Sequence, residues 1–173
     1  MIYIFCATKS EAQAIVEYKK LKKRKQGALT LFVSDTVTLC VSGVGKEAAR
    51  KTVNAFKKEF SLMKDDIVLN IGIAAAPPHI PIGSLCVIGR VVTNDKEYRM
   101  QAKGETLTCK NEAVSTYHTT LVDMESCVFA EHFLANLTIY KVVSDHFDPS
   151  VVTKEGTKAL IAAVLVEIEP LRS

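Results

Sequence analysis

Three acidic residues of the sequence lie next to predicted strands. Glu11 follows an apolar run at residues 3–7, and Asp145 comes directly after the run at 139–144. Glu125 lies in the sequence Val-Asp-Met-Glu-Ser. Such a set suits cleavage of a glycosidic bond, because one acid protonates the leaving group, a base activates water and a further group holds the sugar. Singly, each acid also fits a structural role, as a turn residue, a helix-dipole partner or an exposed helix acid. The hypothesis of a site therefore depends on the three together.

Apolar segments of strand length alternate with segments of helical periodicity. Strands are expected at 3–7, 29–33, 36–41, 67–71, 84–93 and 137–143, and helices at 9–25, after Gly45, at 124–135 and at 151–171. This order predicts a three-layer αβα fold with a mostly parallel, mixed central sheet, in a single domain over residues 1–173. In such sheets ligands bind beyond the carboxyl ends of the strands, where the three acids are expected to meet.

Two polar segments stand apart from this pattern. Residues 94–120 form a polar stretch with no predicted strand or helix. The cationic run at 19–25 is expected to be the solvated last turn of the first helix, where cations suit the helix dipole. A surface that binds polyanions is the alternative for this run.

Composition excludes several classes of protein. The chain has 22 Lys and Arg against 19 Asp and Glu, a balance of +3 that gives no reason to expect nucleic acid as a partner. The five cysteines are odd in number and never occur as Cys-x-x-Cys, which favours reduced thiols. Residues 1–7 have no basic region typical of a signal peptide, and no apolar run is long enough for a membrane span. A cytoplasmic location is therefore expected.

The glycine turn at 43–45 suggests two cofactor sites, and neither fits. Cys40 stands where a P-loop has its first glycine, and Glu47 follows the lysine where Ser or Thr belongs. The turn matches G-x-G-x-x-A, but it follows the third predicted strand rather than the first. The four histidines show no metal-ligand spacing, and no serine lies in a nucleophile elbow. Neither a cofactor nor a metal is expected.

Five segments, taken in order, resemble the nucleoside phosphorylase and nucleosidase superfamily. They are Ala7–Glu11, Ser42–Lys46, Asn70–Ala75 with the following Ile82-Gly83, Val122–Ser126 and Val143–Asp145. The similarity is closest to the hydrolytic branch, methylthioadenosine/S-adenosylhomocysteine nucleosidase and futalosine hydrolase. It covers most of the chain and implies a nucleoside phosphorylase-like fold, a purine nucleoside as substrate, no cofactor and a homodimer.

The resemblance also implies roles for individual residues. Glu11 is expected to be the base that activates water, and Asp145 the acid that protonates N7 of the purine. Glu125 is expected to hold the ribose hydroxyls, with Met124 packing on the sugar. Ser144 would orient Asp145. The remaining expected substrate contacts are Ile73 and Val114.

Two other activities are compatible with the same resemblance. A phosphorylase needs cationic donors for phosphate, but the loop after the first strand offers Lys9 alone and Glu11 would repel the anion. Hydrolysis is therefore preferred. A catalytically reduced binding or regulatory protein is the other alternative, because the segment at 94–120 is shorter than in relatives. In addition, Ala75-Ala76 stand at positions where relatives have glycines.

Overall fold

A ten-stranded sheet runs through the computed structural model, which describes residues 1–172. The strands are β1 (Ile2–Cys6), β2 (Lys22–Gln26), β3 (Leu29–Val33), β4 (Val37–Val41), β5 (Ile67–Ala75), β6 (Leu85–Val92), β7 (Glu97–Arg99), β8 (Glu105–Cys109), β9 (Leu121–Asp123) and β10 (Leu137–Asp145). The α-helices are α1 (Lys9–Tyr18), α2 (Lys46–Glu59), α3 (Ser126–Phe133) and α4 (Lys154–Val164). Short 3₁₀ turns cover Pro149–Val151, Leu165–Glu167 and Glu169–Leu171.

The centre of the sheet is parallel. Strand β1 pairs in parallel with β4 and β5, and β5 pairs in parallel with β10. Antiparallel pairing brings β3 and then β2 onto the β4 side. The carboxyl ends of β1, β4, β5 and β10 therefore lie at one edge, as the alternating pattern predicts. The predicted mixed α/β fold is confirmed.

Beyond β5 the pairings form a closed ring. Strand β10 pairs with β5 and β6, β6 pairs with β8, β8 with β9, and β9 returns to β5. The return rests on one residue pair, Ala75 opposite Val122. Because β9 leads directly into Met124 and Glu125, this ring brings a segment from late in the chain to the end of β5.

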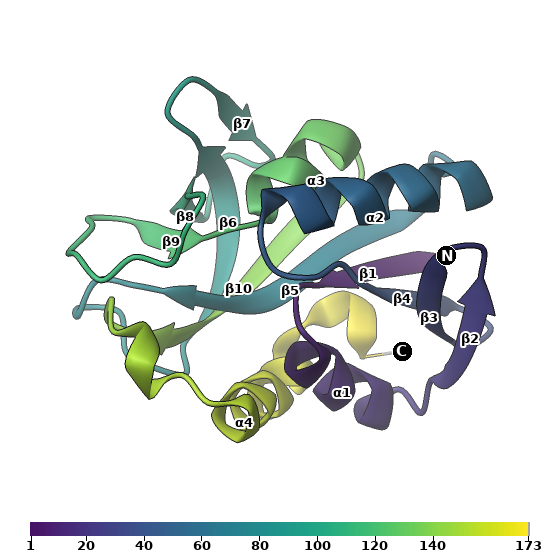
Figure 1. Cartoon of the computed structure of the whole chain (residues 1–173), viewed down its shortest axis with the longest axis horizontal. Coiled ribbons are helices and arrows are strands. Elements are labelled where there is room, and N and C mark those ends of the chain that lie inside the picture. The colour runs from purple at the N-terminus through teal and green to yellow at the C-terminus, as the bar shows by residue number, and fades with distance from the viewer. Residues whose placement is uncertain (173) are drawn as a thin grey trace.

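Helices cover both faces of the sheet (Figure 1). Helices α2 and α3 lie on one face, and α1 and α4 lie on the other. Under α2 and α3, Tyr3 and Phe5 of β1 meet Phe56 at ring-centroid distances of 5.1 and 5.2 Å. Phe5 also lies 5.4 Å from Phe133. This aromatic cluster joins both helices to the central strand. Within residues 1–172, no helix is both long enough and apolar enough to cross a membrane.

The prediction of a helix over 9–25 is wrong in its second half. Helix α1 ends at Tyr18, and residues 22–26 form the edge strand β2, paired antiparallel with β3. A turn at Gly27, whose φ of +55° suits glycine, joins the two strands. Lysines on an edge strand oppose pairing with another chain, so the cations have a structural role here. That this run binds polyanions stays a prediction.

Other predicted boundaries also needed correction. The polar stretch 94–120 contains β7 and β8, which the sequence pattern did not predict. These short strands form because β6 supplies a long partner for both. The helix predicted over 151–171 is regular only in α4, and 3₁₀ turns flank it. The helix predicted over 124–135 is confirmed in its centre as α3.

The aromatic cluster makes Phe56 the residue whose truncation should destabilise the fold most clearly. Its side chain is 0 % exposed and contacts aromatic rings from both α3 and β1. We expect Phe56→Ala to lower the free energy of unfolding by about 3–5 kcal/mol, measured by urea denaturation. The matched control is Lys58→Ala on the exposed side of the same helix, which should change it by less than about 0.5 kcal/mol. Equal effects of the two variants would contradict this packing.

Candidate active site

A pocket of about 320 Å³ opens at the carboxyl edge of the central strands. Its lining comes from the last residues of β5, β9 and β10 and from segments that follow β1, β4, β8, β9 and β10. All seven residues singled out from the sequence line it: Glu11, Ile73, Val114, Met124, Glu125, Ser144 and Asp145. The structure thus brings together side chains that are up to 134 positions apart along the chain, from 11 to 145.

Glu11 is fixed at the start of α1. Its Oε2 accepts a hydrogen bond from the Thr8 N–H at 2.7 Å, and the Thr8 hydroxyl accepts from the Glu11 N–H at 3.2 Å. This capping box satisfies the first turn of the helix. Its Oε1 accepts from the Ile73 N–H at 3.0 Å. A Cβ at Gly72 would lie 2.7 Å from Oε1, so glycine is needed for this approach. The carboxylate is therefore held in one place, between β1 and β5.

Glu125 reaches the glycine turn after β4. Its Oε1 accepts a hydrogen bond from the Gly45 N–H at 2.6 Å. Gly45 has a φ of +89°, a left-handed conformation that favours glycine and aims this N–H at the carboxylate. The Ser42 hydroxyl donates to the Cys6 carbonyl at 3.2 Å and ties the same turn to β1. The turn thus positions an acid of the pocket.

Asp145 ends β10 and is hydrogen-bonded on both oxygens. Its Oδ1 lies 2.6 Å from the Ser144 hydroxyl, and its Oδ2 accepts from the Asp148 N–H at 2.9 Å. The Ser144 hydroxyl also lies 3.3 Å from the carbonyl of Ala74. That hydroxyl can donate to Asp145 when the acid is ionised. When the acid is protonated, it can accept from Asp145 and donate to Ala74 instead.

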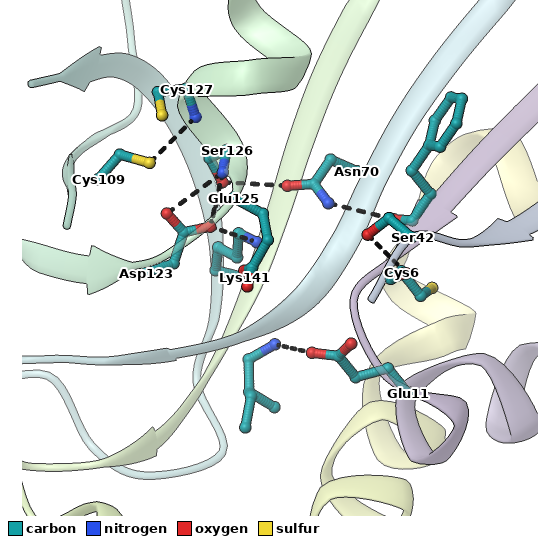
Figure 2. A network of polar contacts seen from close by, with 12 residues as sticks. Cys6, Glu11, Ser42, Asn70, Cys109, Asp123, Glu125, Ser126, Cys127 and Lys141 are labelled. Carbon is teal, nitrogen blue, oxygen red and sulfur yellow. Dashed lines mark hydrogen bonds and ion pairs between the residues drawn. The ribbon is translucent and has the colours of Figure 1, made fainter. Parts of the chain in front are cut away.

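A buried ion pair behind the pocket was not predicted from the sequence. The Lys141 ammonium lies 2.9 Å from Asp123 Oδ2, and both side chains are buried. Asp123 also accepts hydrogen bonds from the N–H and hydroxyl of Ser126. The Ser126 hydroxyl contacts Asn70 Oδ1 at 3.0 Å, and Asn70 donates to the Phe5 carbonyl at 3.1 Å (Figure 2). The available signal was a lysine inside the apolar strand Leu-Thr-Ile-Tyr-Lys-Val-Val.

Apolar side chains form the remaining walls of the pocket. They include Val44, Ile73, Val114, Met124 and Val152. Lysine and arginine are absent from its lining among residues 1–172. In the same part of the chain, no three His, Cys, Asp or Glu side chains converge to hold a metal ion. The pocket therefore combines carboxyl groups with apolar walls, an arrangement that suits a sugar and a flat base.

Lys141 controls the charge state of the site. Burial alone lowers its pKa, but Asp123, Glu125 and Glu11 more than offset burial, so the pKa of Lys141 is raised. Burial and the nearby Asp123 raise the pKa of Glu125 to about 7, against the opposing effects of Lys141 and the Gly45 N–H. One ammonium group thus partly neutralises three carboxyl groups in a buried region.

Removing the Lys141 charge should destabilise the protein strongly. Lys141→Met leaves Asp123 buried without its cation, and we expect a loss of about 3–5 kcal/mol in the free energy of unfolding. The loss should be smaller at pH 5 than at pH 8, because protonation of Glu125 then relieves part of the repulsion. Urea denaturation at both pH values measures this. The double variant Lys141→Met/Asp123→Asn should recover part of the loss, and no recovery would contradict the charge argument.

The raised pKa of Glu125 predicts a specific pH dependence of stability. The folded state binds the Glu125 proton more tightly than the unfolded chain, whose carboxyl has the ordinary value of 4.5. Its contribution to the free energy of unfolding is therefore full below about pH 4.5 and falls as the pH rises through about 7. Glu125→Gln lacks this titration. From pH 5 to pH 8, we expect its free energy of unfolding to rise by on the order of 1–3 kcal/mol relative to that of the unmodified protein. Parallel stability curves for the two proteins would show that Glu125 titrates normally.

Comparison with solved structures identifies the fold. No protein-family model and no curated protein sequence matches the chain. The methylthioadenosine/S-adenosylhomocysteine nucleosidase of Helicobacter pylori matches with a TM-score of 0.79 and 14 % identity, over 99 % of this chain and 97 % of that one. A putative enzyme of the same description from Francisella philomiragia gives the same four values. Futalosine hydrolase of Helicobacter pylori matches with a TM-score of 0.74 and 15 % identity, over 96 % and 97 % of the two chains. The chain therefore has the fold of these nucleosidases and of futalosine hydrolase.

Proposed function

We propose that this chain is a purine nucleosidase that hydrolyses the N-glycosidic bond of a methylthioadenosine/S-adenosylhomocysteine- or futalosine-type nucleoside. The observation that carries the proposal is the meeting of Glu11, Glu125 and Asp145 at one pocket with apolar walls. The fold shared with nucleosidases of both types supports it.

Glu11 is suited to activate water. Two main-chain N–H groups fix its carboxylate, so the side chain needs no reorganisation before it accepts a proton. Lys141 contributes a positive charge close to this carboxylate, since a Cβ at Gly72 would lie 2.7 Å from Glu11 Oε1 and 3.4 Å from the Lys141 ammonium nitrogen. A carboxylate held in place beside the sugar also stabilises the positive charge that develops on the ring.

Asp145 is suited to protonate the departing base. Its Ser144 partner can accept a hydrogen bond from the protonated acid while donating to the Ala74 carbonyl. The Asp148 N–H keeps the second oxygen in position in either state. Transfer of the proton neutralises the negative charge that the purine would otherwise carry as it leaves.

Glu125 is suited to hold ribose hydroxyl groups. Its Oε1 is occupied by the Gly45 N–H, which leaves Oε2 to accept from a hydroxyl of the sugar. Met124 lines the pocket beside it and offers an apolar surface to the ring. Because the pKa of Glu125 is raised to about 7, sugar binding should weaken as the pH falls below that value.

Water is favoured over phosphate as the attacking group. The pocket is lined by acids, and cationic side chains are absent from the described part of its lining. Phosphate would therefore meet repulsion without a compensating donor set.

A homodimer and a cytoplasmic location remain predictions. Val44 lines the pocket and is 57 % exposed, so a second subunit would have room to cover it.

The test is release of free base. The protein is incubated with methylthioadenosine, S-adenosylhomocysteine, futalosine, inosine and uridine, with and without phosphate, and the base is quantified by chromatography. We expect release without phosphate from at least one 5′-substituted purine nucleoside. Glu11→Gln and Asp145→Asn should each lower kcat by about 10²–10⁴, whereas the exposed Glu47→Gln should not.

Other outcomes would identify the alternatives. A strict phosphate requirement with a sugar phosphate as product would indicate a phosphorylase. Thermal stabilisation by adenine without any base release would indicate a binding or regulatory protein. Unchanged kcat in Asp145→Asn would remove the proposed acid from the mechanism.

A further inference from the structure

Two cysteines lie in contact just behind the carboxyl groups of the pocket. The Cys127 N–H donates to the Cys109 sulfur at 3.4 Å, and Figure 2 shows that sulfur directed at the main chain of Cys127. This contact brings the Cys109 sulfur against the residue that carries the second thiol. Both are free and almost buried, with 2 % of Cys109 and 5 % of Cys127 exposed. The mechanism proposed above uses neither of them.

Each cysteine is connected directly to the site. Cys109 ends β8 and is the register partner of Asp123, the residue that pairs with Lys141. Cys127 lies in the first turn of α3, two residues after Glu125. The two cysteines are 18 positions apart, and the segment between them includes Val114, Met124 and Glu125, which line the pocket. A bond between the sulfurs would therefore close one wall of the pocket into a covalent loop.

The surroundings make the two thiols unequal. The neighbouring Cys109 side chain lowers the pKa of Cys127; burial opposes this, and the positive charges of Lys46 and Arg50 add to it. The neighbouring Cys127 side chain, burial and the Asp123 charge raise the pKa of Cys109, although the hydrogen bond from the Cys127 N–H acts in the opposite direction. The surroundings therefore favour Cys127 as the first of the two thiols to lose its proton. A thiolate with an adjacent thiol is the arrangement typical of redox-sensitive cysteines.

We propose that Cys109 and Cys127 form a reversible disulfide when the protein meets hydrogen peroxide. The Cys127 thiolate attacks one peroxide oxygen; the sulfur–oxygen bond forms, the oxygen–oxygen bond breaks and, with one proton, water leaves. The Cys109 sulfur then attacks the Cys127 sulfenic acid, and the hydroxyl group leaves as a second water with the Cys109 proton. Two thiols and one peroxide thereby give one disulfide and two waters.

The disulfide should loosen the contact between Glu125 and Gly45. Because a disulfide fixes the distance between its sulfurs at about 2.05 Å, we expect its formation to draw the first turn of α3 toward β8. Glu125 immediately precedes that turn, and its hydrogen bond to Gly45 reaches across to the start of α2. Displacement of α3 therefore withdraws this carboxyl group from the glycine turn.

The other cysteines provide internal controls. Cys6 and Cys40 lie on adjacent strands but belong to the hydrophobic cores on opposite faces of the sheet. Cys86 lies on β6, and no cysteine lies opposite it on β10. These three thiols are buried, and burial raises the pKa of each. They should stay reduced under conditions that oxidise the Cys109–Cys127 pair.

The experiment treats the purified full chain with hydrogen peroxide and maps the products by non-reducing peptide mass spectrometry. We expect a cross-linked peptide joining Cys109 to Cys127, an intact mass lower by about 2 Da, and full reversal by dithiothreitol. Cys109→Ser should give no cross-link, and dimedone should trap a sulfenic acid on Cys127. Cys86→Ser should form the same disulfide as the unmodified chain.

A second measurement follows the site without depending on catalysis. Hydrogen exchange of the peptide containing Gly45 is compared before and after oxidation, and exchange of that amide should become at least about tenfold faster. Absence of the Cys109–Cys127 cross-link, or cross-links distributed among all five cysteines, would overturn the proposed pair. A cross-link with unchanged Gly45 exchange would overturn its connection to the site. Both readouts are independent of whether the protein is a nucleosidase.

Discussion

The site depends on one buried ammonium group. Without Lys141, the carboxyl groups of Asp123, Glu125 and Glu11 would be left in a poorly solvated region with little to offset their repulsion. Its ion pair with Asp123 also anchors β9 to β10, and through Ser126 and Asn70 the network reaches β1. The same contacts that stabilise the charge therefore hold together the strands whose ends form the pocket.

The sequence was sufficient to locate the acids but not their counter-ion. Glu11 and Asp145 were recognisable because each lies near the end of an apolar strand, where an α/β sheet exposes its functional residues. Lys141 lies inside such a strand, in phase with the buried Leu137 and Ile139, but this pattern does not identify the acid that pairs with it. Its partner Asp123 is 18 residues away, so the interaction exists only after β9 and β10 have been brought into the same sheet.

The errors in the secondary structure predicted from the sequence have a similar origin. The residues at 22–26 are cationic and continue a helical segment, so local propensity favoured a helix over the edge strand β2. Strands β7 and β8 are polar because they pair on a partly exposed part of the sheet, and their pairing comes from β6. In each case a partner strand decides the conformation, and the segment's own composition does not indicate it.

We propose that the carboxyl groups gathered around Lys141 direct water, and not phosphate, to a glycosidic bond. Turnover of a 5′-substituted purine nucleoside in water enriched with heavy oxygen tests this most directly, in buffer containing phosphate. We expect free base and a sugar whose anomeric hydroxyl carries the solvent label, with a mass higher by about 2 Da. An unlabelled sugar phosphate, or no release of base at all, would contradict it.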